Sequence, residues 1–168
     1  MSVPAIRASS ALDFSLVSFL IIDDQPFSRR MVRSMLVGFG SREVYESANG
    51  VEAFELARNV MPNIIVTDLV MPIFNGLRFI KMVKDPQSPT HAIPIMVLSG
   101  YLTKAAAVMV RETGADELLV KPVSPKALYE HLTHLVLRSD PENPLAFVRH
   151  KRRHPEPQRK KAGDVTYL

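Results

Sequence analysis

The stretch NIIVTDLVMPIFNG, residues 63–76, decides the fold of this chain. It begins as a short apolar run, reaches Asp68, and passes through a proline and a glycine before a helical pattern starts. A continuous apolar run of this length between turn signals is typical of a strand buried on both faces. Packing alone would not choose an aspartate at the end of such a strand. The stretch therefore predicts a parallel sheet and a place to look for chemistry.

Similar apolar runs flank this stretch on both sides, with helical patterns between them. The predicted strands are residues 17–22, 43–47, 63–67, 94–98 and 117–120. The predicted helices run from residue 26 to 38–40 and over residues 51–60, 77–84, 103–113 and 126–138. Alternating strands and helices predict an α/β fold: a five-stranded parallel sheet with five helices on both faces and right-handed crossovers. Residues 43–47 alternate in polarity and indicate an edge strand.

The 168 residues, 46% of them hydrophobic, suffice for one domain with extensions. We expect an irregular N-terminal arm at residues 1–15, the domain at 16–138, and a basic, proline-containing C-terminal tail at 139–168. The absence of cysteine excludes disulfides and thiol chemistry and fits a cytoplasmic protein. No apolar run approaches the ~18 residues that cross a bilayer, so we expect no membrane partner.

The net charge of +4 is concentrated in the tail. Basic residues exceed acidic ones by one in residues 1–138 and by three in residues 139–168. Aromatic residues are not interleaved with the basic run, so base stacking is unsupported and we expect no nucleic-acid partner. The four prolines of the tail also leave no room for a helix-turn-helix, so we expect a stand-alone domain.

Polar residues stand at four predicted strand ends: Asp23 and Asp24, Asp68, Ser99, and Lys121. In a parallel sheet these ends share one edge. Each residue alone has an ordinary structural interpretation, as a helix cap, a turn residue or a surface charge. Together, three carboxylates would repel by about 3 kcal/mol per pair at ~5 Å and an effective dielectric of ~20, which calls for a cation. Oxygen ligands favour Mg²⁺, and a lysine and a hydroxyl suit phosphoryl oxygens, so the set predicts phosphoryl transfer to a carboxylate.

Over residues 18–138 the chain resembles the receiver domain of bacterial two-component response regulators. The resemblance rests on the apolar strand ending in Asp23-Asp24, on residues 64–68, on Met71-Pro72 with Gly76, on residues 97–100, and on Val120-Lys121-Pro122. The segment DLVMPIFNG, residues 68–76, is highly specific in this context. The resemblance implies the flavodoxin-like strand order 2-1-3-4-5.

The resemblance also implies how a metal ion and a phosphoryl group would be held. Asp68 would be the phosphoacceptor. Mg²⁺ would be bound by Asp24, Asp68 and the Val70 carbonyl, with Asp23 acting through a metal-bound water.

The remaining roles that the resemblance implies concern the switch after phosphorylation. Ser99 would move onto the phosphoryl group and Lys121 would pair with it, with a cis peptide bond before Pro122. The family often has an aromatic switch residue where this chain has Leu118, and Tyr101 is the nearest aromatic that could substitute. Val70 and Tyr101 flank the path of the hydrolytic water in the family. Neither orients water well, so we expect slow self-dephosphorylation.

The function that follows is signalling rather than enzymatic catalysis. The phosphoryl donor would be a sensor histidine kinase or a histidine phosphotransfer protein. The output would be a changed surface, roughly residues 102–138, read by a downstream protein, or onward phosphotransfer. The alternative is an adaptor with a receiver fold that works without phosphorylation. A nucleotide hydrolase is disfavoured because the chain has no glycine-rich phosphate loop.

Overall fold

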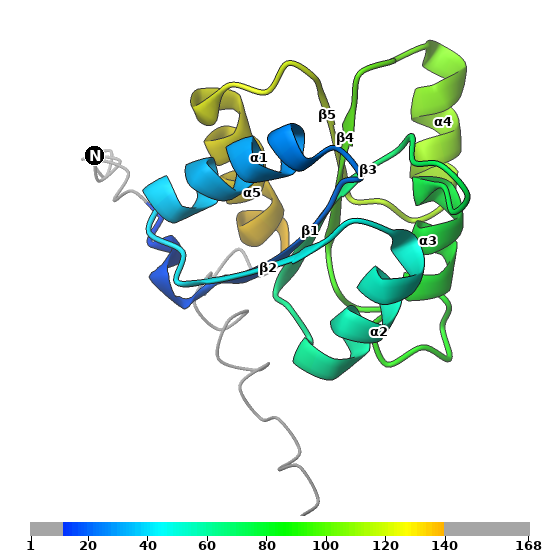
Figure 1. The fold of residues 1–168 in the computed structure, drawn as a ribbon, viewed down its shortest axis with the longest axis horizontal. Helices are drawn as coiled ribbons and strands as arrows, with labels where there is room; N and C mark the ends of the chain where they lie inside the picture. The colour runs from blue at the N-terminus through cyan, green and yellow to red at the C-terminus, as the bar shows by residue number, and fades with distance from the viewer. Residues whose placement is uncertain (1–11, 140–168) are drawn as a thin grey trace, which may run out of the picture.

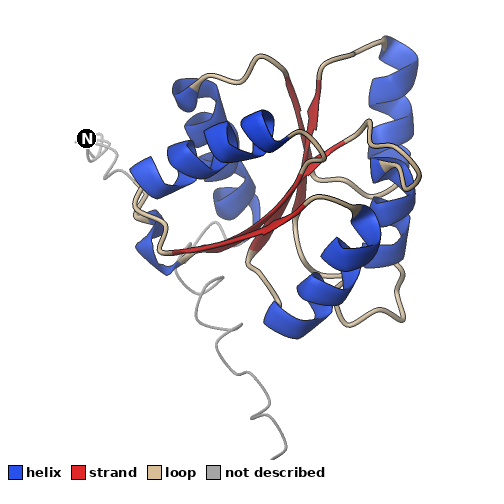
Figure 2. Ribbon diagram, in the orientation of Figure 1, coloured by secondary structure: helices blue, strands red, loops and turns tan. Residues whose placement is uncertain are grey.

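The computed structural model describes residues 12–139, which form a parallel sheet between two layers of helices (Figures 1 and 2). The five strands lie in the order β2-β1-β3-β4-β5, which confirms the predicted α/β fold and its strand order. The strands are β1 Ser18–Ile22, β2 Glu43–Ser47, β3 Ile64–Asp68, β4 Ile95–Ser99 and β5 Glu117–Val120. The helices are α1 Pro26–Gly38, α2 Gly50–Val60, α3 Gly76–Val83, α4 Lys104–Glu112 and α5 Pro125–Ser139.

The three inner strands are apolar because helices cover both of their faces. Every residue of β1, β3 and β4 is buried, whereas the edge strand β2 is largely exposed or half-buried. The pairing register of β1 and β3 determines which residues lie side by side at the end of the sheet. Ile22 pairs with Thr67, so the residues that follow them, Asp23 and Asp68, come level at the carboxyl end of the sheet.

Alternating strand residues divide the core into two layers. On one face, Phe19 and Ile21 pack with α1 and α5, and on the other, Leu20 and Ile22 pack with α2 and α3. Figure 1 shows the same division, with α1 and α5 on one side of the sheet and α2, α3 and α4 on the other. Both faces of the three inner strands are therefore shielded from water. The polar groups at their carboxyl ends must find hydrogen-bond or charge partners close by.

The helices α2, α3 and α4 begin with a side-chain cap. The side chains of Asn49, Asn75 and Thr103 accept hydrogen bonds from the backbone amides at the starts of α2, α3 and α4. Pro26 occupies the first turn of α1, where a missing amide proton costs nothing. The anchoring of the helices differs: α5 buries four residues, whereas α4 buries only Val110.

The end of the expected irregular arm is packed onto the domain instead. A 3-10 helix at Phe14–Leu16 begins at Asp13, whose carboxylate accepts the Ser15 amide at 2.8 Å. The Phe14 ring is fully buried and lies edge-on to Tyr129, with the ring centroids 5.5 Å apart. A single aromatic in a polar segment has no period, so burial of its large apolar area could not be predicted from pattern. The rest of the arm, residues 1–11, and the tail from residue 140 lie outside the described residues.

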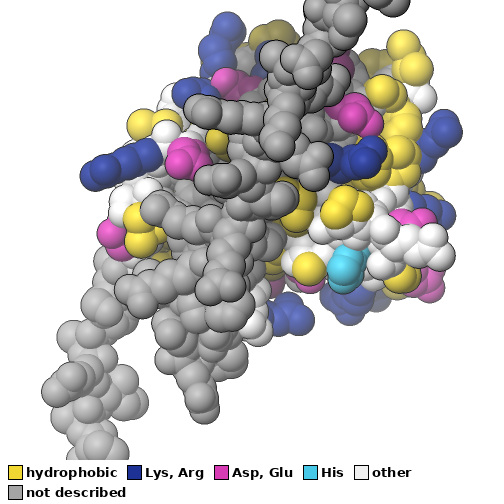
Figure 3. Space-filling view, turned by 90° about the horizontal axis from the view of Figure 1, so that it is seen from below, with side chains coloured by type: hydrophobic (Ala, Val, Ile, Leu, Met, Phe, Trp, Pro, Cys, Tyr) yellow, Lys and Arg dark blue, Asp and Glu magenta, His cyan; other side chains and the backbone are white. Residues whose placement is uncertain are grey.

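Over the described range, no helix is both long and apolar enough to cross a bilayer. Figure 3 views the molecule from below the orientation of Figure 1. On the part of this face that is visible, basic, acidic and apolar side chains of the described residues are interspersed.

Candidate functional site

Three aspartates meet at the carboxyl edge of the sheet. Asp23 and Asp24 directly follow β1, and Asp68 is the last residue of β3. One carboxylate oxygen from each lies within 4.8 Å of the others. Asp23 and Asp68 are buried, with 2% and 8% of their surface exposed, whereas Asp24 is half-buried. The structure thus brings together the three carboxylates that the sequence placed at strand ends.

Burial and the neighbouring charges act in different directions on the pKa of Asp68. Burial raises the pKa of the Asp68 carboxyl above its usual value, the Lys121 ammonium lowers this pKa, and the Asp23 carboxylate raises it. The Leu69 amide also donates to Asp68 Oδ1 at 2.8 Å. The carboxylate form therefore lacks full compensation within the described residues, and an added positive charge at this edge would favour it.

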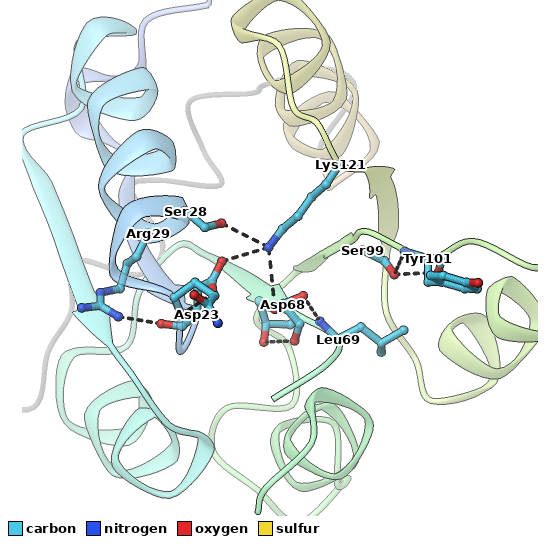
Figure 4. Close-up of polar contacts among 10 residues, drawn as sticks. Asp23, Ser28, Arg29, Asp68, Leu69, Ser99, Tyr101 and Lys121 are labelled. Carbon is cyan, nitrogen blue, oxygen red and sulfur yellow. Dashed lines mark hydrogen bonds and ion pairs between the residues drawn. The ribbon is translucent and has the colours of Figure 1, made fainter. Parts of the chain in front are cut away.

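Lys121, which directly follows β5, brings a positive charge to the aspartates (Figure 4). Its Nζ donates to Asp23 Oδ2 at 3.0 Å and to Ser28 Oγ at 3.1 Å, and lies 3.6 Å from Asp68 Oδ2. The Lys121–Pro122 peptide bond is cis. One ammonium opposite three carboxylates leaves an excess of negative charge, unless some are protonated or a cation joins them.

The chemistry of this edge fits a divalent hard cation. Its donors are carboxylate oxygens, and Asp24 keeps the cluster in contact with solvent. Mg²⁺ prefers such oxygen ligands and retains several waters, which a partly open edge allows. Val70, two residues after Asp68, is 69% exposed at the same edge. The residues present therefore fit the magnesium that the sequence predicts.

The Ser99 hydroxyl is not directed at Asp68. It donates to the Tyr101 carbonyl at 2.7 Å, and the Tyr101 amide lies 3.2 Å from the same oxygen (Figure 4). Ser99 is buried, whereas the Tyr101 side chain is 79% exposed. The hydroxyl is thus occupied by its own loop, and it would have to leave that loop to reach a group on Asp68.

Leu118 lies away from the carboxylates, in a groove between α4 and β5. The groove has a volume of about 540 Å³ and its lining includes Leu102, Val110, Arg111, Leu118 and Arg138. Leu118 is half-buried there, and Leu102, which follows Tyr101 in the chain, lines the same groove. The two possible switch residues of the sequence analysis thus differ in exposure, because Leu118 is half-buried and Tyr101 is exposed.

Two residues of the site were missed by reasoning from the sequence. Ser28 contacts Lys121, and Arg29 donates from Nη1 to the Asp23 carbonyl at 2.6 Å. Arg29 Nε also lies 3.4 Å from the Glu46 carboxylate on β2. Both stand in the first turns of α1, where serine and arginine are ordinary surface residues. Only the direction in which the helix leaves the sheet reveals their role.

Comparison with known proteins agrees with this geometry. The sequence profile of the response regulator receiver domain matches residues 19–133. The chemotaxis protein CheY1 of Helicobacter pylori is 33% identical over 117 residues, which is 69% of this chain and 94% of that protein. The CheY homolog of Campylobacter jejuni is 31% identical over 117 residues, 69% of this chain and 89% of that protein. The crystal structure of CheY4 of Vibrio cholerae superposes with a TM-score of 0.66 at 31% identity and covers 71% of this chain and 98% of that one.

Proposed function

Because the chain belongs to the response regulator receiver domain family, we propose that Asp68 accepts a phosphoryl group from the phosphohistidine of a sensor histidine kinase or a histidine phosphotransfer protein. The observation that carries this proposal is the position of Asp68. It is a buried carboxylate with two acids and a lysine around it, at the edge where parallel sheets bind ligands. We place the reaction in the cytoplasm.

In the proposed step, a carboxylate oxygen of Asp68 attacks the phosphorus of the phosphohistidine. The phosphorus–nitrogen bond breaks as the phosphorus–oxygen bond forms. The electron pair returns to the imidazole nitrogen, which takes up a proton. Lys121, 3.6 Å from Asp68 Oδ2, faces the place where the phosphoryl oxygens arrive and balances their charge.

Asp24, Asp68 and the Val70 carbonyl would hold Mg²⁺, with Asp23 acting through a water. When bound, the ion neutralises charge on the phosphoryl oxygens. Asp23 is suited to the indirect role because both of its oxygens are already engaged. Oδ1 accepts the Gln25 amide at 2.9 Å and Oδ2 accepts Lys121 at 3.0 Å.

The signal would pass from Ser99 to the surface around α4. A phosphoryl group on Asp68 offers acceptors for the Ser99 hydroxyl, which would then release the Tyr101 carbonyl. The Tyr101 loop leads directly into α4, whose only buried residue is Val110. A downstream protein would recognise the resulting change, so the protein signals rather than turning over a substrate.

Beryllofluoride, an unreactive phosphoryl mimic, tests this proposal. In the presence of Mg²⁺ it should bind wild-type protein and shift the amide NMR signals of residues 99–112, and Asp68→Ala should abolish both effects. A phosphorylation-independent adaptor would show no such response and would bind its partner equally with and without the mimic. Lack of binding to the wild-type protein would overturn the proposal.

A further inference from the structure

The first turn of α1 carries a hydroxyl that reaches the candidate phosphorylation site. We propose that Ser28 is a positioning residue that keeps the Lys121 ammonium at ion-pair distance from Asp68 without a hydrogen bond to it, so that the acceptor oxygen is not taken up by a lysine proton and the ammonium faces the incoming phosphoryl group. This inference rests on the proposed phosphorylation of Asp68. It concerns Ser28, which the resemblance to receiver domains leaves without a role.

The Lys121 ammonium makes two hydrogen bonds and one longer ion pair. Lys121 Nζ lies 3.0 Å from Asp23 Oδ2 and 3.1 Å from Ser28 Oγ, both hydrogen-bond distances. Its distance to Asp68 Oδ2 is 3.6 Å, longer than a hydrogen bond. Figure 4 shows the ammonium between Ser28 on one side and Asp68 on the other. An ammonium has three protons, so two are committed and the third is available on the side of Asp68.

Without the Ser28 hydroxyl, electrostatic attraction would set the position of the lysine. Asp23 and Asp68 are both acidic and buried, and the flexible lysine side chain would settle between them. Lys121 would then shorten its ion pair with Asp68 to a hydrogen bond and occupy the oxygen that must attack phosphorus. It would also leave the position facing the phosphoryl oxygens. The neutral hydroxyl prevents this because it binds the ammonium without adding negative charge.

The hydroxyl can act in this way because its helix turn is fastened to the sheet. Val32 and Leu36 anchor α1 in the core, and Pro26 restricts the backbone of the first turn. Arg29, the next residue, holds the Asp23 carbonyl at 2.6 Å. Ser28 therefore binds the lysine and Arg29 binds the aspartate of one ion pair, Lys121–Asp23.

The first test is the rate of phosphorylation by acetyl phosphate with Mg²⁺. In this reaction an Asp68 oxygen bonds to phosphorus as the bond from phosphorus to the acetate oxygen breaks, and acetate leaves with the electron pair. Ser28→Ala should lower the rate by about tenfold or more, as expected when a hydrogen bond to a charged group is lost. Ser28→Thr keeps a hydroxyl and should restore the rate. Ser34→Ala, the same change at an exposed serine of α1, should leave the rate unchanged.

A double-mutant cycle distinguishes positioning of Lys121 from a merely structural role. If Ser28 acts through Lys121, Ser28→Ala should have no further effect in the Lys121→Gln background. An equal loss in both backgrounds would overturn the proposal. So would a wild-type rate for Ser28→Ala, or failure of Ser28→Thr to restore it when both variants melt at the wild-type temperature.

NMR of the Lys121 ammonium in metal-free protein gives a readout that does not depend on the reaction. Exchange of the ammonium protons with water should speed up in Ser28→Ala and stay slow in Ser28→Thr and Ser34→Ala. Unchanged exchange in Ser28→Ala would overturn the proposal. If wild-type protein took up no phosphoryl group at all, the proposed function would fail instead, and the exchange measurement would still decide whether Ser28 holds Lys121.

Discussion

The two ends of the proposed signalling path, the carboxylate site and α4, are built differently. At the phosphoacceptor side, the side chains of Asp23 and Lys121 and the Asp23 carbonyl are held by hydrogen bonds of 2.6 to 3.1 Å. At the α4 side, Val110 alone is buried in the helix, and Val108 and Met109 are more than half exposed. Local unfolding costs least where few apolar contacts hold an element. The difference is what the proposed function requires, namely a rigid site for the phosphoryl group and a helix that a small free energy can move.

The largest expected contrast between the two sides is in stability. Leu36→Ala, in the helix α1 whose first turn borders the candidate site, removes a fully buried side chain and should lower the free energy of unfolding by about 2–5 kcal/mol. Val110→Ala should cost only about 1–2 kcal/mol and mainly loosen α4. Native-state hydrogen exchange checks this: the α4 amides of wild-type protein should exchange faster than those of α1. Equal protection of the two helices would remove the contrast.

Without metal, the charge on Asp68 should lower the free energy of unfolding, and this effect should depend on pH. Because burial raises the pKa of Asp68 in the folded protein, the contribution of this carboxyl is most favourable below its unfolded pKa of about 3.9 and declines as pH rises through the folded value. Asp68→Asn should therefore raise the unfolding free energy at about pH 7 in chelator and have little effect near pH 3.

Asp13→Asn provides the opposite sign as a control. Hydrogen bonds from Ser15 hold the pKa of Asp13 below its usual value, so its stabilisation is present above the unfolded pKa and lost as pH falls. Asp13→Asn should lower stability at neutral pH. Chemical denaturation across pH measures both variants, and the same sign for both would contradict the assignment of burial as the main influence on Asp68.

These expectations also show how far the sequence alone can lead. Buried parallel strands must be apolar throughout, so their ends, and with them Asp23, Asp68 and Lys121, could be located from hydrophobic runs. The hydrogen bond of Ser28 could not, because nothing in the sequence distinguishes it from Ser34. Nor could the direction of the Ser99 hydroxyl, which depends on a local turn. Such contacts depend on where the folded backbone directs each side chain, and residue type alone does not determine this.

The lifetime of the phosphoryl group should respond to Val70 at the mouth of the site. Val70 is 69% exposed and has no polar group to orient an attacking water. Val70→Asn should shorten the half-life of phosphorylated Asp68 by about threefold to tenfold, because the asparagine amide can hydrogen-bond to an attacking water and orient it. Loss of phosphoryl group over time measures this. Val108→Asn on α4 should leave the half-life unchanged, and a wild-type half-life of seconds that Val70→Asn fails to shorten would contradict the account.

The smallest expected effect concerns strain in the loop after Asp68. Ile73 has a φ of 68° and its side chain is fully exposed, although β-branched residues disfavour this left-handed conformation. Ile73→Asn should stabilise the protein by about 1 kcal/mol. Thermal unfolding measures the change. A loss of stability would mean that the isoleucine makes a favourable contact that its exposure does not suggest.

The central proposal is that the carboxylate of Asp68 becomes an acyl phosphate at the edge of the sheet where Asp23, Asp24 and Lys121 surround it. Mass spectrometry after treatment with acetyl phosphate tests it most directly. The account predicts one phosphoryl group per chain, dependent on Mg²⁺, mapped to Asp68 and absent in Asp68→Ala. A phosphoryl group on another residue, or equal uptake by Asp68→Ala, would contradict it.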